Sequence, residues 1–270
     1  MSGIQIIEIE SVEDLLLAVN RDTKKWVHDG FAKPWFRGVK DIKYRLLPSI
    51  LRSGNDICEF NLTKKFRLMA PGFDKTPETN RIDQWLFLMQ HNGIPTRLLD
   101  WSESPLIACF FATEKAASSQ EILNDAVIYA IDPIQLNLAS DITEFPNTWS
   151  QNSILQTIKF AFGTETELVD GKRITYLEYP VAIYPSTIHA RIASQKGCFT
   201  LHGNDKRDFE TIFKDHKLIN DKYLMKYRIQ KEKVTEIFKE LSNLGITYSS
   251  LFPDLEGLSK ELKYSFNLND

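Results

Sequence analysis

The sequence lacks the features that mark several large classes of protein. Its longest apolar run, residues 106–112, falls far short of the roughly 18–20 residues that span a bilayer, so we expect no membrane association. Lysine and arginine number 33 against 36 aspartate and glutamate, and this net charge of −3 excludes the strongly basic composition of a nucleic-acid coat protein. Residues 1–13 carry three acidic and no basic side chains, so we expect neither a signal peptide nor a transit peptide.

Cysteine is also scarce, with Cys58, Cys109 and Cys198 as the only three. An odd count without CxxC spacing is typical of buried thiols in a reducing compartment, so we expect a cytoplasmic protein without structural zinc. The sequence contains no HExxH, GxGxxG, Walker A or GxSxG motif. These absences exclude the common zinc-protease, phosphate-loop and serine-nucleophile signatures, and we expect no metal cofactor.

What the sequence does contain is the composition of an ordinary globular protein. Of its 270 residues, 43% are hydrophobic and 26% are charged, which is enough for a sizeable core. Capping residues and apolar periodicity predict helices over residues 11–28, 56–69 and 80–91, one starting at Ser104-Pro105, and one ending at Gly245. Strands are predicted near residues 34–38, 94–101, 126–131, 181–184 and 198–202, whereas residues 135–175 show no clear period.

This order of elements predicts an α+β fold with mixed or antiparallel central sheets and flanking helices. We divide the chain into an N-terminal helical segment (1–29), a core domain (30–205) and a C-terminal helical segment packed on the core (206–270). Residues 206–239 hold ten lysines and arginines against six acidic residues. That local excess favours a nucleic-acid partner, although lysines on a helix usually form only a solvated face.

Three segments place polar residues among apolar ones. In the first, Arg37 lies between bulky aromatics, which is costly unless its guanidinium meets a phosphate, a carboxylate ligand or an internal acid such as Asp100. Gly38 leaves room for a close backbone approach. We expect Arg37 to face a cavity near residues 90–102 and 191–199. We also expect Asp100 to be buried, ionised and paired with Arg37, Arg97 or Arg191.

The second segment, residues 90–102, packs a large polar network that either lines a pocket or holds the core together. Within it, Trp101 is a stacking surface or simply core, and His91 is a site residue or a partner of a helix dipole. The third segment, residues 189–203, contains Gln195 before a glycine and a strand. Gln195 either binds an amide or ribose hydroxyl or caps a turn.

These segments resemble the blocks of a known family. The Phe36-Arg37-Gly38 tripeptide is similar to the motif that names the FRG domain family, and residues 90–101, QHNGIPTRLLDW, resemble its long second block. Residues 191–199 resemble a third block, and residues 252–257 resemble a frequent C-terminal feature. The resemblance covers roughly residues 30–258 and implies a bacterial or phage-associated protein.

A more distant resemblance is to the arginine-type ADP-ribosyltransferases. They carry an aromatic-Arg-Gly strand, a Ser/Thr strand leading into a helix, and a strand headed by Gln/Glu-x-Glu. The resemblance implies that Arg37 holds the phosphates of NAD and that Thr96 and Ser102 lie near the Ser/Thr strand. Gln195 then begins the acidic block, but Gly197 replaces the expected catalytic glutamate.

Gln195 can bind a ribose hydroxyl but supplies no charge to the transition state, so another carboxylate would be needed. The candidates are Asp100, Glu165, Glu167 and Glu178.

The resemblance implies an NAD-dependent ADP-ribosyltransferase of bacterial toxin or phage-defence type, with NAD as substrate and a nucleic acid or protein as acceptor. The implied catalytic residues are Arg37, Gln195 and Asp100, and the implied NAD-binding residues are Arg37, Gly38, Thr96, Arg97, Trp101 and His91. An antitoxin or chaperone protein is the implied partner. The alternative is a non-catalytic nucleotide-sensing or interaction domain, which the missing glutamate favours.

Overall fold

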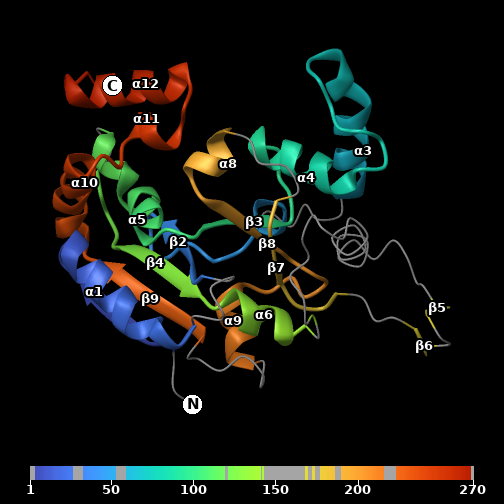
Figure 1. The fold of residues 1–270 in the computed structure, drawn as a ribbon, viewed down its shortest axis with the longest axis horizontal. Helices are drawn as coiled ribbons and strands as arrows, with labels where there is room; N and C mark the ends of the chain where they lie inside the picture. Colours follow the sequence, from blue (N-terminus) through green and yellow to red (C-terminus); the bar gives the residue numbers. More distant parts are fainter. Residues whose placement is uncertain are drawn as a thin grey trace.

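The computed structural model describes residues 4–26, 33–52, 59–118, 121–140, 142, 168–169, 172–173, 177–185, 190–215 and 223–268. Its centre is a seven-stranded mixed sheet in the order β1-β9-β4-β2-β3-β8-β7 (Figure 1). Only the β1–β9 pair is parallel among the described ladders of this sheet. The α+β prediction is therefore confirmed. The seven strands are β1 (Ile6–Ile9), β2 (Trp35–Val39), β3 (Leu98–Ser102), β4 (Ala126–Ile131), β7 (Val181–Ile183), β8 (Gly197–Leu201) and β9 (Leu224–Ile229).

Helices cover both faces of this sheet, and β4 shows how its sequence sets the two cores. Ala126, Ile128 and Ala130 pack with α1 (Val12–Asp22), α5 (Pro105–Thr113) and α10 (Val234–Asn243). Val127, Tyr129 and Ile131 point the other way and pack with α6 (Pro133–Leu138) and α9 (Phe209–Asp215). Because alternate residues of a strand face opposite sides, a strand covered on both faces is apolar throughout.

The remaining elements lie around the ends of the sheet. α4 (Ile82–His91) packs against β3, β7 and β8 in a third apolar cluster. α11 (Tyr248–Leu251) lies beside α8 (Ala190–Ser194), and α12 (Leu255–Ser265) packs on α11 (Figure 1). The other described elements are η1 (Lys24–Trp26), α2 (Ser49–Arg52), α3 (Glu59–Met69), η3 (Ala70–Gly72), η4 (Glu114–Ala117), η6 (Lys231–Lys233) and a small hairpin of β5 (Leu168–Val169) with β6 (Lys172–Arg173).

The two end segments are not purely helical, which corrects the expectation for residues 1–29 and 206–270. Each gives one strand to the central sheet, and these two strands, β1 and β9, pair with each other. β9 also pairs with β4 along six residues, so it joins the C-terminal segment to the core rather than leaving it as an appendage. The predicted first helix begins as expected after the Ser11 cap but ends at Asp22, and residues 27–28 of the prediction lie outside the described residues.

Gly38 is required by the packing of α5 on β2. A Cβ atom at this position would lie 1.8 Å from the carbonyl oxygen of Ala108 and 2.6 Å from the amide nitrogen of Ala112. Helix α5 is apolar, and Pro105 begins it as predicted. The close approach expected at Gly38 is therefore to this buried helix.

Candidate functional site

The candidate site is a cavity of about 640 Å³ at the middle of the sheet. It lies where β2 and β3 pair through a single residue couple, Phe36 with Ser102, although each strand has five residues. Side chains from β2, β3, β8, α4, α5 and α8 line the space next to this short ladder. The polar and charged lining residues used below are Arg37, Lys40, Tyr44, Arg45, Arg52, Gln90, His91, Asp100, Ser102, Lys115, Arg191 and Gln195.

Arg37 reaches across the gap between these two strands, as predicted. Its Nη1 donates to the backbone carbonyl of Asp100 and lies 3.6 Å from the carboxylate Oδ2 of the same residue. Burial lowers the pKa of the Arg37 guanidinium, the Asp100 charge raises it, and the positive charge of Arg52 lowers it further. Arginine keeps its charge despite such shifts, so the cavity holds two cations that repel each other and favour an anion.

Asp100 is paired with Arg37 but is not buried, which corrects one expectation. Its side chain is 55% exposed and faces the cavity. Both carboxylate oxygens accept hydrogen bonds from Gln90 Nε2 at 3.0 Å. The carbonyl of Gln90 accepts the hydroxyl proton of Thr96 at 2.5 Å.

Thr96 itself is buried and is not among the residues that line the cavity. The hydrogen bonds that run from Thr96 through Gln90 to Asp100 therefore hold the Asp100 carboxylate in position, and they begin at a residue that does not line the cavity.

Arg97 does not line the cavity, which sets it apart from the predicted NAD-binding residues Arg37, Gly38, Trp101 and His91. Its guanidinium forms a forked pair with Glu59 on α3, with Nε–Oε1 at 2.9 Å and Nη2–Oε2 at 2.5 Å. Its Nη1 also donates to the backbone carbonyl of His202 at 3.2 Å. Arg97 therefore ties α3 to the end of β8.

Gln195 and Arg191 reach the cavity from α8 and the turn that follows it, and the C-terminal segment holds both. Gln195 Nε2 donates to the backbone carbonyl of Leu251 at 3.1 Å. The Ser102 hydroxyl donates to the backbone carbonyl of Gln195 at 2.7 Å. The guanidinium of Arg191 lies 4.5 Å from the ring centroid of Phe252. Gln195 thus occupies the cavity as predicted while also tying α8 to α11.

The comparisons with known proteins bear on this arrangement. The sequence model of the FRG domain family matches residues 32–121. The chain carries an FRG domain. No match was found among curated proteins or among solved structures. Arg37, Gln90 and Asp100 lie inside the matched segment of the FRG domain, whereas Arg191 and Gln195 lie outside it and complete the same cavity.

Trp101, His91 and Gly38 also line the cavity of the FRG domain. Trp101 is 3% exposed, and its indole nitrogen donates to Thr200 Oγ1 at 3.0 Å, so most of the ring belongs to the core. His91 ends α4 and is exposed at the cavity. Gly38 contributes only backbone atoms to the cavity lining. The packing of α5 leaves no room for a side chain at this position.

Asp100 is the carboxylate that the FRG domain places in the cavity. Of the other candidates, Glu178 is exposed and is not a lining residue, and Glu165 and Glu167 lie outside the described residues. Gly197 does line the cavity, and a Cβ atom there would meet Ile192 at an ordinary 3.4 Å. A glutamate at position 197 is therefore missing from the sequence, although the backbone there has room for a Cβ atom.

Sequence reasoning missed most of the positive charge in the cavity. Among the described lining residues, Asp100 is the one carboxylate, and the cations are Arg37, Lys40, Arg45, Arg52, Lys115 and Arg191. Lys40, Arg45 and Arg52 follow β2 in a loop and a short helix without periodicity, so no sequence signal directs them inward.

The basic excess at residues 206–239 is placed elsewhere. No described residue of this stretch lines the cavity, and Arg207, Lys226 and Arg228 pair with carboxylates of the body. The described part of this stretch therefore adds no cation to the cavity.

The cysteines, metal ligands and long apolar helices foreseen or excluded above can also be placed in the described residues. Cys109 and Cys198 are free and fully buried, as predicted, and burial raises the pKa of both thiols, while Cys58 lies outside the described residues. Among the residues that the structure describes, no group of three histidine, cysteine or acidic side chains is arranged to hold a metal ion. Within the same residues, no helix combines the length and apolar character needed to cross a bilayer.

Proposed function

We propose that the cavity binds NAD as a substrate and that the protein is an ADP-ribosyltransferase of bacterial toxin or phage-defence type. The observation that carries this proposal is the facing of Arg37 and Asp100 in a cavity whose other charged lining groups are cations. A cationic cavity suits the pyrophosphate of a dinucleotide. A fixed carboxylate suits a reaction in which positive charge develops on a sugar.

Each residue has a role that follows from its position. Arg37 and Arg191 bind the pyrophosphate, and Gln195 and His91 contact the sugar and the leaving base. The bond between ribose C1′ and the nicotinamide nitrogen breaks, and its electron pair leaves with nicotinamide. A nucleophilic atom of the acceptor then bonds to C1′ and loses its proton. Asp100, held by Gln90, stabilises the positive charge at C1′ in between.

The direct test is incubation with NAD labelled in its adenosine part, with and without DNA, RNA and cell lysate. We expect nicotinamide release and transfer of label to an acceptor. Arg37→Lys lowers both by at least about tenfold, because a point charge does not reproduce the fork of a guanidinium. The matched control is Lys64→Ala on α3, whose side chain is exposed and outside the cavity. Binding of NAD without nicotinamide release under every condition would contradict the transferase.

One observation favours the alternative, a nucleotide-sensing domain without catalysis. Gly197 stands where the resemblance expects a glutamate, and Gln195 at the head of the same block is engaged with Leu251. The two hypotheses differ in what a new carboxylate would do. The Cβ atom that Gly197→Glu adds has room next to Ile192. It accelerates nicotinamide release if the cavity holds NAD in a reactive position, and leaves release absent if the cavity only senses the nucleotide.

A toxin function has its own test, which is growth of a bacterial host after induced expression. We expect the wild-type chain to arrest growth and Arg37→Lys to abolish the arrest at equal protein level. An antitoxin-like partner protein would restore growth without lowering that level. Equal growth with both chains would contradict the toxin proposal while leaving the NAD assay to decide the chemistry.

A further inference from the structure

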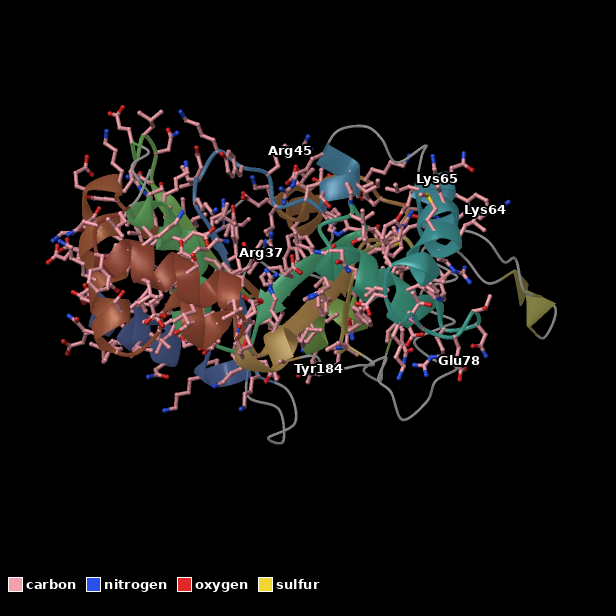
Figure 2. All side chains as sticks on the ribbon, turned by 90° about the horizontal axis from the view of Figure 1, so that it is seen from above. Arg37, Arg45, Lys64, Lys65, Glu78 and Tyr184 are labelled. Atoms are coloured by element: carbon pink, nitrogen blue, oxygen red, sulfur yellow. The ribbon has the colours of Figure 1, made fainter. Side chains whose placement is uncertain are left out.

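The mouth of the cavity carries exposed groups of two kinds, cationic and aromatic. We use "mouth cluster" for Lys40, Tyr44, Arg45 and Arg52, which follow β2 in the chain and all line the cavity. The Tyr44 residue is 54% exposed, and the side chains of Arg45 and Lys40 are 64% and 42% exposed. In Figure 2, Arg37 and Arg45 lie over the middle of the molecule, whereas Lys64 and Lys65 lie on α3 at one end.

The charges of the cavity exceed what a bound dinucleotide needs. Arg37 is paired with Asp100, Arg45 with Asp208 at 3.1 Å, and Lys40 with Glu114. Among the described residues, no carboxylate pairs with the remaining three lining cations, Arg52, Lys115 and Arg191. NAD carries a negative charge on each phosphate and a positive one on nicotinamide, so positive charge remains at the mouth after NAD binds.

An exposed aromatic ring among cations is the arrangement that binds single-stranded nucleic acid. Backbone phosphates bind lysine and arginine, and an unpaired base stacks on the aromatic face. Tyr44 is one of few large apolar side chains left open at the cavity, where a monomeric protein gains nothing from exposing it. Acidic side chains of a peptide would match the charge of the cations but would supply no flat ring to stack on Tyr44.

We infer that the mouth cluster binds single-stranded nucleic acid and that this strand is the acceptor of the reaction. The inference rests on the proposed function and assigns its second substrate. A base stacks on Tyr44, while Arg45, Arg52 and Lys40 contact the phosphates on either side. The nucleophile is a nitrogen or oxygen of the strand. It forms the new bond to ribose C1′ after the bond to nicotinamide has broken and nicotinamide has left with the electron pair, and its proton passes to solvent.

The test is fluorescence anisotropy of labelled twelve-nucleotide DNA and RNA strands over a series of salt concentrations, with the full chain. Tyr44→Ala should weaken binding about tenfold, through loss of one stacked base. Arg52→Ala, which removes the cation of the mouth cluster that no described carboxylate pairs, should weaken binding and reduce the slope of log affinity against log salt by about one. The matched controls are Lys64→Ala and Lys65→Ala, which remove equally exposed cations outside the cavity and should change neither quantity.

The outcomes separate this inference from the proposed function. Strand binding that responds to the mouth variants and not to the α3 controls supports the inference. NAD cleavage with label transferred only to polypeptide would overturn the inference and leave the transferase standing. Strand binding that falls equally in the α3 controls would also overturn it, since the contact would then be unspecific. Strand binding without NAD binding would reject the proposed function and with it the acceptor role.

Discussion

Arg97 and Asp100 lie close together in the sequence, and each belongs to an arginine–carboxylate pair. The two pairs differ in burial, and burial determines how much each contributes to the stability of the fold. The Arg97 and Glu59 side chains are 12% and 6% exposed, whereas Asp100 opposite Arg37 is 55% exposed. Removing one member of a buried pair strands the other charge, at a cost of roughly 3–5 kcal/mol. In the second pair solvent screens the Asp100 carboxylate, and Arg37, which is 19% exposed, keeps the backbone carbonyl of Asp100 as a partner, so this pair contributes about 1 kcal/mol or less.

We therefore predict opposite consequences for two substitutions. Glu59→Ala lowers the free energy of unfolding by roughly 3–5 kcal/mol in urea titration. Asp100→Ala lowers it by about 1 kcal/mol or less yet abolishes nicotinamide release. A loss of stability as large for Asp100→Ala as for Glu59→Ala would show that Asp100 is structural.

His202 gives a prediction about pH. Its ring is fully buried, and neither ring nitrogen has a hydrogen-bond partner among the described residues. Burial, and then the charge of Arg97, lowers the pKa of His202 from 6.5 to about 3. The unfolded chain therefore takes up a proton before the folded one does. Its contribution to stability is complete above about pH 6.5 and is lost as the pH falls towards 3.

Between pH 7 and pH 5 the wild-type chain should lose about 2 kcal/mol more of its free energy of unfolding than His202→Leu. Denaturant titration of both proteins at the two pH values measures this difference, and the contributions of other groups cancel. Equal losses in the two proteins would mean that the fold does not lower the pKa of His202.

At the scale of elements, sequence patterns predicted the helices and strands whose apolar spacing and end residues lie within the element itself. Helix α4 has a one-sided apolar face and is followed by Gly93 with φ +71°, and β4 is apolar throughout, so both were recognisable. β9 was missed because its sequence, LMKYRI, contains two cations. Lys226 is nevertheless buried, since Glu210 pairs with it at 2.5 Å from a different element.

The candidate site divides in the same way. Arg37, Asp100 and Gln195 were found because each belongs to a compact local motif. The role of Arg97 could not be read from that motif, since its partner Glu59 lies 38 residues away in the sequence. Only the packed fold brings such distant partners together, and only the packed fold places the irregular loop that carries Arg45 beside the cavity.

The turn between α11 and α12 yields a prediction about ligand binding. Phe252 lies under Arg191 and contacts Phe111, and both neighbours line the cavity. Phe252→Leu keeps apolar volume but loses the aromatic face, so we expect ADP-ribose to bind about two- to fivefold more weakly in calorimetry. Phe266→Leu, which changes an exposed aromatic directly after α12, is the control.

The role of Phe252 as a positioning residue for Arg191 has a second check. Adding Phe252→Leu to Arg191→Met should weaken ADP-ribose binding no further than Arg191→Met alone. Additive effects of the two substitutions would mean that Phe252 acts on the cavity independently of Arg191.

At the scale of the whole molecule, the segment matched by the FRG family is not a self-sufficient unit. Residues 32–121 supply β2 and β3, which share one residue couple. The long ladders of these strands run to β4 and β8, both beyond residue 121. Isolated residues 32–121 would expose two apolar strands without partners.

We predict that a fragment of residues 32–121 does not fold, whereas the 270-residue chain does. The fragment should show no cooperative thermal transition by circular dichroism and poor dispersion in amide NMR spectra. A cooperative transition in the fragment would show that β4 and β8 are dispensable for folding.

The pairing of β1 with β9 joins residues that are about 220 positions apart in the sequence. During synthesis the first strand leaves the ribosome long before its partner exists, and at roughly 5–20 residues per second it waits for at least about ten seconds. Closing so long a loop late is slow, and until then β4 lacks its neighbour on that side. The sheet therefore becomes complete only after translation has passed residue 229, and the contact of Leu251 with Gln195 at the cavity forms later still.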